Sequence, residues 1–393
     1  MCGRATGQTD ILLRAMPPTQ TGANNTPPEE ELMPAPEMQA AAESAGSSAR
    51  NATELIAAIL QQSRLDALAA CDANVVSYDP GSFLMIFRCR GRQMPFVIKP
   101  LLVLVMWGVV WALIFARFER VRLAMLPLED LITPLLTPVS FLLVFRLARA
   151  AVRFWDARAA AGKLVEVCRT MASSALVACA SQPELADGFA RWICAYPIAV
   201  KNFLRPAARR GWQPETRLRK QRNELGALLT DAEAAELIHV GTNQSGGMAP
   251  ITVLNHLRQL AFRASAELRV DAAVRAAIYR HLTEQIDTLT GAMGAMERIN
   301  ATPLPFAYVV HLRTFLVLYL LAWNLEALAL HGWSAFPTLV LVSWALLGIE
   351  AAAVECERPF RWDANHLALG RMGVVVSQNV GQTLRGVVGE DTR

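Results

Sequence analysis

One stretch of the chain carries aromatic and polar side chains at a spacing that suits contact with an ion. Thr137, Phe141 and Phe145 follow one another at intervals of four residues, so a helix would place all three on one face. Arg149 extends the same stripe by one more turn. A phenyl ring has a negative face and a positive edge, so ring edges turned toward water would attract an anion weakly. At about 1.5 Å of rise per residue, the stripe from Thr137 to Phe145 spans about 12 Å.

The remaining chemistry-bearing residues show no pattern that indicates an enzyme. The seven cysteines are odd in number and form no CxxC motif, and the six histidines form no HxxxH pair. The sequence also shows no nucleophile–base pair and no phosphate-binding loop. We therefore expect no catalytic residues, no cofactor and no metal site.

The composition indicates a membrane protein. Hydrophobic residues make up 53% of the 393 residues and charged residues only 18%, whereas soluble domains carry about 25% charge. The mean hydropathy is +0.28. The net charge of +4 is too small to indicate a nucleic-acid partner.

Four apolar segments account for this composition, and we expect membrane spans at about 96–116, 131–153, 302–325 and 333–349. The first could alternatively be a buried core helix. The second contains Pro134 and Pro138 and continues into Arg146, Arg149 and Arg153, so it suits contact with lipid poorly. Such a segment is tolerated at membrane depth where it faces protein or water, which makes it a candidate pore-lining helix.

Outside these spans the sequence predicts helices and no strands. Residues 157–300 show amphipathic periodicity and predict a cytosolic helical layer, whose last helix repeats apolar residues from Val274 and Ile278 to Met293. Residues 1–75 are expected to be disordered or weakly helical, and residues 386–393 to form a tail. The cluster of basic residues after the second span places that end, and both termini, in the cytosol. The fold class is thus an all-α membrane protein with four spans.

A basic stretch from Arg205 to Arg222 lies between the predicted cytosolic helices. A solvated surface explains it, and attraction of anions to the inner mouth of a pore is the functional alternative.

Three segments, in the right order, resemble the bestrophin family, including its bacterial, plant and algal members. They are T-P-V-S-F-L-L-V-F-R-L-A-R-A-A-V-R-F-W-D-A-R from Thr137, E-R-I-N-A-T-P-L-P-F-A-Y-V-V-H-L-R from Glu297, and G-I-E-A-A-A-V-E-C-E-R-P-F-R-W-D-A-N from Gly348. The resemblance covers roughly residues 76–385, which we expect to form one channel domain.

The resemblance implies a homopentamer with one pore on its fivefold axis. Thr137, Phe141 and Phe145 align with the family's pore neck, although packing between helices is the alternative role of the two phenylalanines. Counting back from Pro303 places a lower constriction near Val274 and Ile278. We expect Arg149 to attract anions at the inner mouth. For Arg146 we expect a structural ion pair, with Asp156 or Glu166 as candidate partners.

The function that follows is conduction of small anions, chloride first and bicarbonate or nitrate as further candidates, across a plasma membrane or a chloroplast thylakoid membrane. A cation-conducting homologue and a non-conducting membrane scaffold are the alternatives. Calcium regulation of the animal kind is not expected, because Asp363 stands alone beside Arg361 and calcium requires six to eight oxygen ligands. For the nearby acids Glu350, Glu355 and Glu357 we expect basic partners in Arg358 or in neighbouring subunits.

Overall fold

The computed structural model describes residues 52–76, 81, 94–205, 214–242, 248–362 and 364–388. Within these residues every regular element is a helix and no strand is present, which confirms the expected all-α class. The expectations for residues 1–51, for Asp363 and for residues 389–393 lie outside the described residues. The expected N-terminal region does contain two short helices, α3 (Ala52–Ile59) and α4 (Gln62–Ala70).

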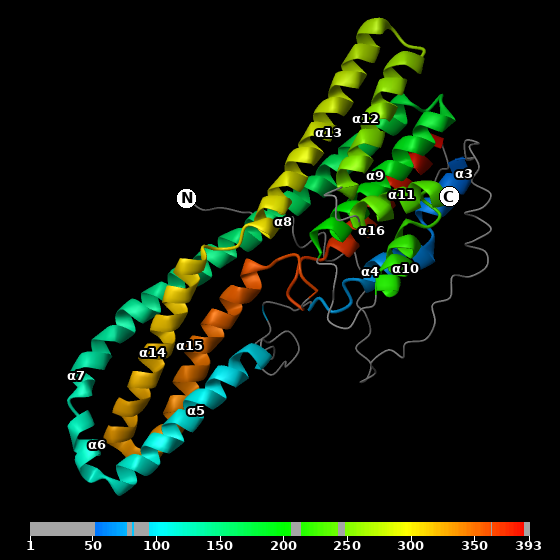
Figure 1. Ribbon diagram of the computed structural model, residues 1–393. Helices are drawn as coiled ribbons and strands as arrows, with labels where there is room; N and C mark the ends of the chain where they lie inside the picture. The colour runs from blue at the N-terminus through cyan, green and yellow to red at the C-terminus, as the bar shows by residue number, and fades with distance from the viewer. Residues whose placement is uncertain are drawn as a thin grey trace.

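The molecule is elongated and has two parts (Figure 1). One part contains α5 (Met94–Arg117), α14 (Phe306–His331), α15 (Phe336–Glu357) and the first half of α8 (Leu136–Ala178). Two short helices, α6 (Glu119–Met125) and α7 (Leu128–Ile132), close the far end. In this part α15 packs against both α8 and α5. Figure 1 shows α8 on one side of the α14–α15 pair and α5 on the other.

Three helical stretches in the described part of the chain are long and apolar enough to cross a membrane, namely Phe96–Arg117, Glu119–Ala178 and Phe306–Glu357. The third contains two helices, α14 and α15, joined by the 3-10 turn Gly332–Ala335. Gly332 has a φ of 55°, a conformation that glycine adopts without steric cost and that lets the chain reverse here. The expected count of four spans stays a prediction.

Among the expected spans, the limits of the second one, 131–153, differ most from the limits of the helix that contains it, α8. Its start is close to expectation, since a 3-10 turn at Thr133–Leu135 precedes α8 and both Pro134 and Pro138 lie where no helical N–H is required. The helix itself does not end at residue 153, because α8 continues without a break for 43 residues, so the expected end of the span at 153 stays a prediction. No glycine or proline occurs between residues 139 and 161, and alanine, leucine and arginine favour the helix there.

The second half of α8 is covered by the other part of the molecule. Three long helices pack against it, α9 (Pro183–Leu204), α13 (Ala272–Ala301) and α16 (Leu369–Val388). A fourth, α12 (Ala249–Glu267), packs on α9 and α13, and α10 (Pro214–Leu225) and α11 (Asp231–Thr242) lie further out. Their shared core includes Leu164, Met171, Phe189 and Leu257. The predicted apolar repeat of α13 is buried from Leu282 onward.

One glycine sets the distance between α16 and α4. A Cβ atom on Gly370 would lie 2.2 Å from the backbone oxygen of Leu68, whereas a Cβ on Gly373 would meet side-chain atoms of Leu68 and Pro197 at an ordinary contact distance of 3.9 Å. The first separation is far below van der Waals contact and involves backbone that cannot rotate away.

We therefore expect Gly370→Ala to lower the free energy of unfolding by about 1–3 kcal/mol, the usual range for an overpacked site. Gly373→Ala on the same helix is the control and should leave stability unchanged or slightly raised, because alanine favours a helix over glycine. The midpoint of thermal unfolding of the detergent-solubilised protein measures both. Equal midpoints for the two variants would show that α4 and α16 separate freely.

Candidate functional site

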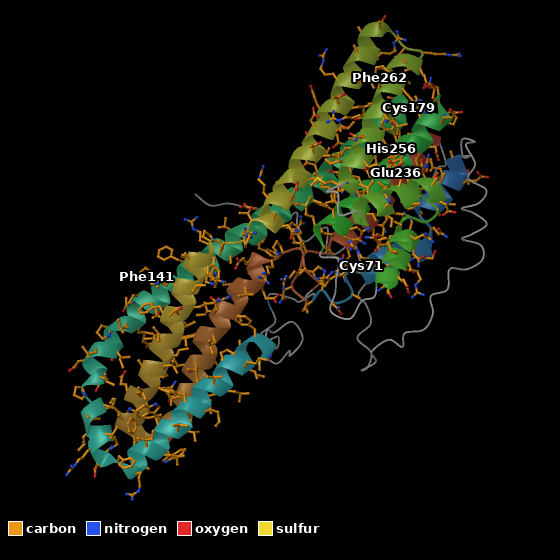
Figure 2. All side chains as sticks on the ribbon, in the orientation of Figure 1. Cys71, Phe141, Cys179, Glu236, His256 and Phe262 are labelled. Carbon is orange, nitrogen blue, oxygen red and sulfur yellow. The ribbon has the colours of Figure 1, made fainter. Side chains whose placement is uncertain are left out.

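The stripe on α8 lies on the exposed side of that helix. Thr137, Phe141, Phe145 and Arg149 are all exposed, with 60% of Phe141 and 57% of Phe145 accessible in the single chain. The ring centroids of Phe141 and Phe145 are 6.0 Å apart, so the two side chains form successive layers along the helix. Figure 2 shows Phe141 projecting away from α14 and α15. The spacing-based prediction of one shared face is confirmed.

The opposite face of α8 is buried against its neighbours. Val139 and Leu143 are each 1% exposed and belong to the same core cluster as Leu312, Leu316 and Leu347 of α14 and α15. Packing therefore uses residues 139 and 143, and the two phenylalanines take no part in that core.

A buried cluster of charges lies on the same inner face. Arg146 is completely buried, and its Nε donates to Glu350 Oε2 at 2.5 Å while its Nη2 donates to Glu357 Oε2 at 3.3 Å. Arg313 Nε donates to the other oxygen of Glu350 at 2.6 Å. Glu350 thus lies between two guanidinium groups, one from α8 and one from α14.

Arg146 has the structural role that the sequence predicted, but the predicted partners Asp156 and Glu166 were wrong. Asp156 lies ten residues further along the same helix, about 15 Å away, so the two side chains cannot meet. The expected partners of Glu350 and Glu357 were wrong too, since their basic partners lie in the same chain on α8 and α14.

The cluster extends to the junction between the two parts of the molecule. Arg153 donates from Nε to the backbone oxygen of Glu357 at 3.0 Å and from Nη2 to that of Ile299. The backbone N–H of Leu304 donates to Glu357 Oε1 at 3.2 Å. No motif or local periodicity in the sequence indicated this junction. The available signal was a matched interval, because Arg146 and Arg153 are seven residues apart, as are Glu350 and Glu357.

The candidates for a lower constriction lie far from the phenylalanines. Val274 and Ile278 are in the first two turns of α13, which begins at the end of the molecule opposite α6 and α7 (Figure 1). Val274 is 47% exposed, and Ile278 is half-buried against the core. The structure brings neither into contact with Thr137, Phe141 or Phe145 within one chain.

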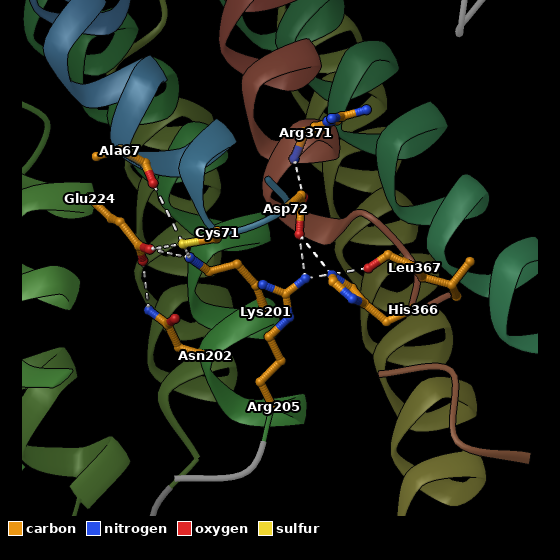
Figure 3. Close-up of polar contacts among 10 residues, drawn as sticks. All are labelled: Ala67, Cys71, Asp72, Lys201, Asn202, Arg205, Glu224, His366, Leu367 and Arg371. Carbon is orange, nitrogen blue, oxygen red and sulfur yellow. Dashed lines mark hydrogen bonds and ion pairs between the residues drawn. The ribbon is translucent and has the colours of Figure 1, made fainter. Parts of the chain in front are cut away.

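A second buried polar cluster joins α4, α9 and α16 (Figure 3). The Asp72 carboxylate accepts hydrogen bonds from Arg205 Nη2 and from the backbone N–H of Arg371, and His366 Nε2 lies 3.1 Å from it. Nearby, Lys201 pairs with Glu224, which also accepts from the Cys71 thiol at 2.9 Å. Arg205 is thus a buried structural residue, which the solvated-surface interpretation of the basic stretch did not predict.

Burial would raise the pKa of the Asp72 carboxyl, but the hydrogen bonds from His366 and Arg205 and the charge of Arg205 outweigh it and hold this pKa below its ordinary value. Burial raises the pKa of the Cys71 thiol to about 11 despite the neighbouring Lys201 charge, so this cysteine is a neutral thiol. No group of three or more histidine, cysteine or acidic side chains that could hold a metal occurs among the described residues.

Comparison with known proteins identifies the family. The model of the Bacterial/Fungal Bestrophin protein family matches residues 74–382. The chain belongs to the bestrophin family. This confirms the resemblance drawn from the three sequence segments, and the chain is an integral membrane protein whose described part has three helical stretches long and apolar enough to cross a membrane.

Named relatives and a solved bestrophin structure agree with this assignment. A protein of Synechocystis sp. named voltage-dependent anion channel-forming protein is 26% identical over 259 residues, which are 65% of this chain and 77% of the relative. A Nostoc sp. protein of the same name is 27% identical over 306 residues, covering 76% and 90%. The crystal structure of a bacterial bestrophin homologue from Klebsiella pneumoniae superposes with a TM-score of 0.60 at 19% identity, covering 75% of this chain and all of that chain, and shows the shared fold.

The charge cluster predicts a large effect of neutralising Glu350. Glu350→Gln removes the acid that Arg146 and Arg313 share, so we expect the free energy of unfolding to fall by about 3–5 kcal/mol, as for other broken buried ion pairs. Glu355→Gln, on the same helix and only partly buried, is the control and should cost less than about 1 kcal/mol. Thermal unfolding in detergent measures both, and a similar loss in the two variants would contradict the role given to Glu350.

Asp72 predicts a pH dependence of stability. Its folded-state pKa is lowered, so it contributes stability above its unfolded pKa of about 4, and this contribution is lost as the pH falls through the folded value. Wild type should therefore be more stable than Asp72→Asn at neutral pH, and the difference in stability between the two proteins should decrease in acid. Unfolding midpoints from pH 7 down to pH 3 test this, and a gap that is constant over that range would refute it.

Proposed function

We propose that this bestrophin is one subunit of a homopentameric anion channel whose neck is formed by Thr137, Phe141 and Phe145 of α8. One observation carries the proposal, namely that these side chains and Arg149 lie on the exposed side of the first half of α8, whereas Val139 and Leu143 pack against α14 and α15. The names of the relatives, voltage-dependent anion channel-forming proteins, support an anion as the permeant ion.

The contrast between α5 and α8 supports water as the environment of the stripe. Between residues 101 and 116 the exposed side of α5 is apolar, with Leu102, Met106 and Leu113 each about as exposed as Phe141. Such a surface suits contact with acyl chains. The exposed side of α8 instead combines aromatic residues with Thr137 and Arg149, and an arginine facing lipid at membrane depth is costly. We therefore assign α5 to the lipid and α8 to the pore.

Five copies around one axis would turn each neck residue into a ring. Phe141 and Phe145 would then form two aromatic layers, whose ring edges offer a weak positive potential without a tight binding site. Conduction requires such weak binding, because an ion must leave as readily as it enters. The Thr137 hydroxyl eases wetting of the outer layer, and Arg149 raises the anion concentration at the inner mouth.

The proposed topology has four membrane helices, formed by α5, the first half of α8, α14 and α15. The helices α9 to α13 and α16 then form the cytosolic layer, with both termini on that side. Val274 and Ile278 would narrow the pore a second time at the far end of α13. Chloride, bicarbonate and nitrate are the ions that we expect to pass.

Planar-bilayer recordings of the purified protein in a potassium chloride gradient test the function. Wild type should give a reversal potential near that of chloride, and replacement of chloride by nitrate should preserve the current. Phe141→Ala should raise the open fraction or alter the anion preference, because removal of a ring lowers the barrier to wetting the neck. Met106→Ala, which changes a side chain of equal exposure on α5, is the control and should behave as wild type.

Three outcomes would contradict parts of this proposal. A reversal potential near that of potassium would make the protein a cation channel, and absence of any current would favour a membrane scaffold. Currents of Phe141→Ala that match those of Met106→Ala would remove Phe141 from the neck.

A further inference from the structure

A cavity of about 830 Å³ lies in the part of the molecule away from α5, α6 and α7. Its described walls come from α9, α10, α11 and α12, together with Arg153 of α8 and the ends of α13 and α15. Pockets that hold small organic ligands usually measure roughly 300–1,000 Å³. The cavity is therefore large enough for a ligand of that class.

The polar residues that line this cavity are mainly cationic. Five arginines contribute to its described walls, Arg153, Arg205, Arg217, Arg358 and Arg361. Among the same lining residues Glu357 is the one acid, and it already accepts from Arg146 and Leu304. The excess of positive charge favours an anionic ligand.

Among the described residues, Arg205 has hydrogen-bond donors without a partner, and Arg217 has no acid partner. Arg205 is 3% exposed and bonds Asp72 and Leu367 through Nη2, while its Nε and Nη1 are buried without a hydrogen-bond partner in the described part of the chain. Burial lowers the pKa of the Arg217 guanidinium with no opposing contribution from an acid. Buried donors and charges without partners are costly unless a ligand satisfies them.

The rest of the wall is apolar. Leu225, Leu237 and Phe360 are nearly completely buried and line the cavity beside the half-buried Phe203. A purely inorganic ion would leave this surface without a partner. The combination of arginines on one part of the wall and leucines and phenylalanines on another fits a molecule that has both a charged group and an apolar body.

We propose that this cavity binds an organic anion with a carboxylate or phosphate group and an apolar body, the charged group lying near Arg205 and Arg217. Pro303 and Glu357, where α14 begins and α15 ends, also line the cavity, so a dissolved anion and the headgroup of an anionic lipid are both possible sources of this chemistry. The proposal concerns binding and holds whether or not the protein conducts ions.

Calorimetric titration of the full chain in nanodiscs of zwitterionic lipid tests it, with 2-naphthoate as the probe and empty nanodiscs as the blank. We expect saturable binding of one 2-naphthoate per chain. The neutral analogue 2-naphthamide should bind at least about tenfold more weakly, because it cannot make charge-assisted hydrogen bonds. Absence of saturable binding, or equal binding of the two probes, would overturn the proposal.

Variants on one helix locate the site. Arg217→Ala should weaken 2-naphthoate binding by about tenfold or more, whereas Arg219→Ala, an exposed arginine two residues along α10, should bind as wild type. Gel filtration and thermal unfolding check that Arg217→Ala is folded. Arg361 also lines the cavity but is exposed, so Arg361→Ala should not disturb folding. This variant should also bind 2-naphthoate more weakly than wild type. If Arg217→Ala, Arg219→Ala and Arg361→Ala all bound 2-naphthoate with equal affinity, the probe would not bind in this cavity.

Nanodiscs that contain the anionic lipid phosphatidylglycerol distinguish a lipid headgroup from a dissolved anion as the natural ligand. Competition with 2-naphthoate in wild type would identify a lipid headgroup as the occupant, and unchanged binding would identify a dissolved anion. If phosphatidylglycerol lowered 2-naphthoate binding equally in Arg217→Ala and wild type, the cause would be repulsion of the probe by the charged membrane. That result would contradict binding in this cavity.

Discussion

The rotation of α8 about its own axis is fixed by the ion pairs that the buried Arg146 makes with Glu350 and Glu357. Both faces of α8 are rich in large apolar side chains, so hydrophobic burial alone would allow either face to pack inward. A buried guanidinium without an acid partner is strongly destabilising, so any rotation that moves Arg146 away from α15 is unfavourable. The aromatic stripe is exposed because Arg146, one residue from Phe145, must face inward.

The same constraint explains what can be predicted from this sequence. The helix of α5, the break near Pro134 and the shared face of Phe141 and Phe145 follow from local composition and periodicity, and the structure contains all three. The partners of Arg146 could not be predicted in this way, because they lie about 200 residues further along the chain and no local rule links them. The position of Val274 and Ile278 in a pore depends on other subunits, so a single sequence gives only their place on α13.

Apolar side chains are exposed along one side of α8. Phe141, Phe145, Val152 and Trp155 are each more than half exposed along one side of α8. A surface of this kind is usually covered by a membrane or by another protein chain. The exposed Arg149 on the same side makes lipid a poor cover, so neighbouring subunits around the proposed pore are the cover that best fits both kinds of residue.

The unbroken length of α8 has a mechanical consequence. A helix of 43 residues is about 64 Å long, and it joins the proposed membrane part to the helical layer as one rod. A tilt of only about 2° around one end would displace the other end by about 2 Å, as the length of the rod dictates. Small shifts of α9, α13 and α16 against one end of α8 would therefore produce larger displacements at its other end. The diameter of the proposed pore neck would then change while every side chain around it keeps its rotamer.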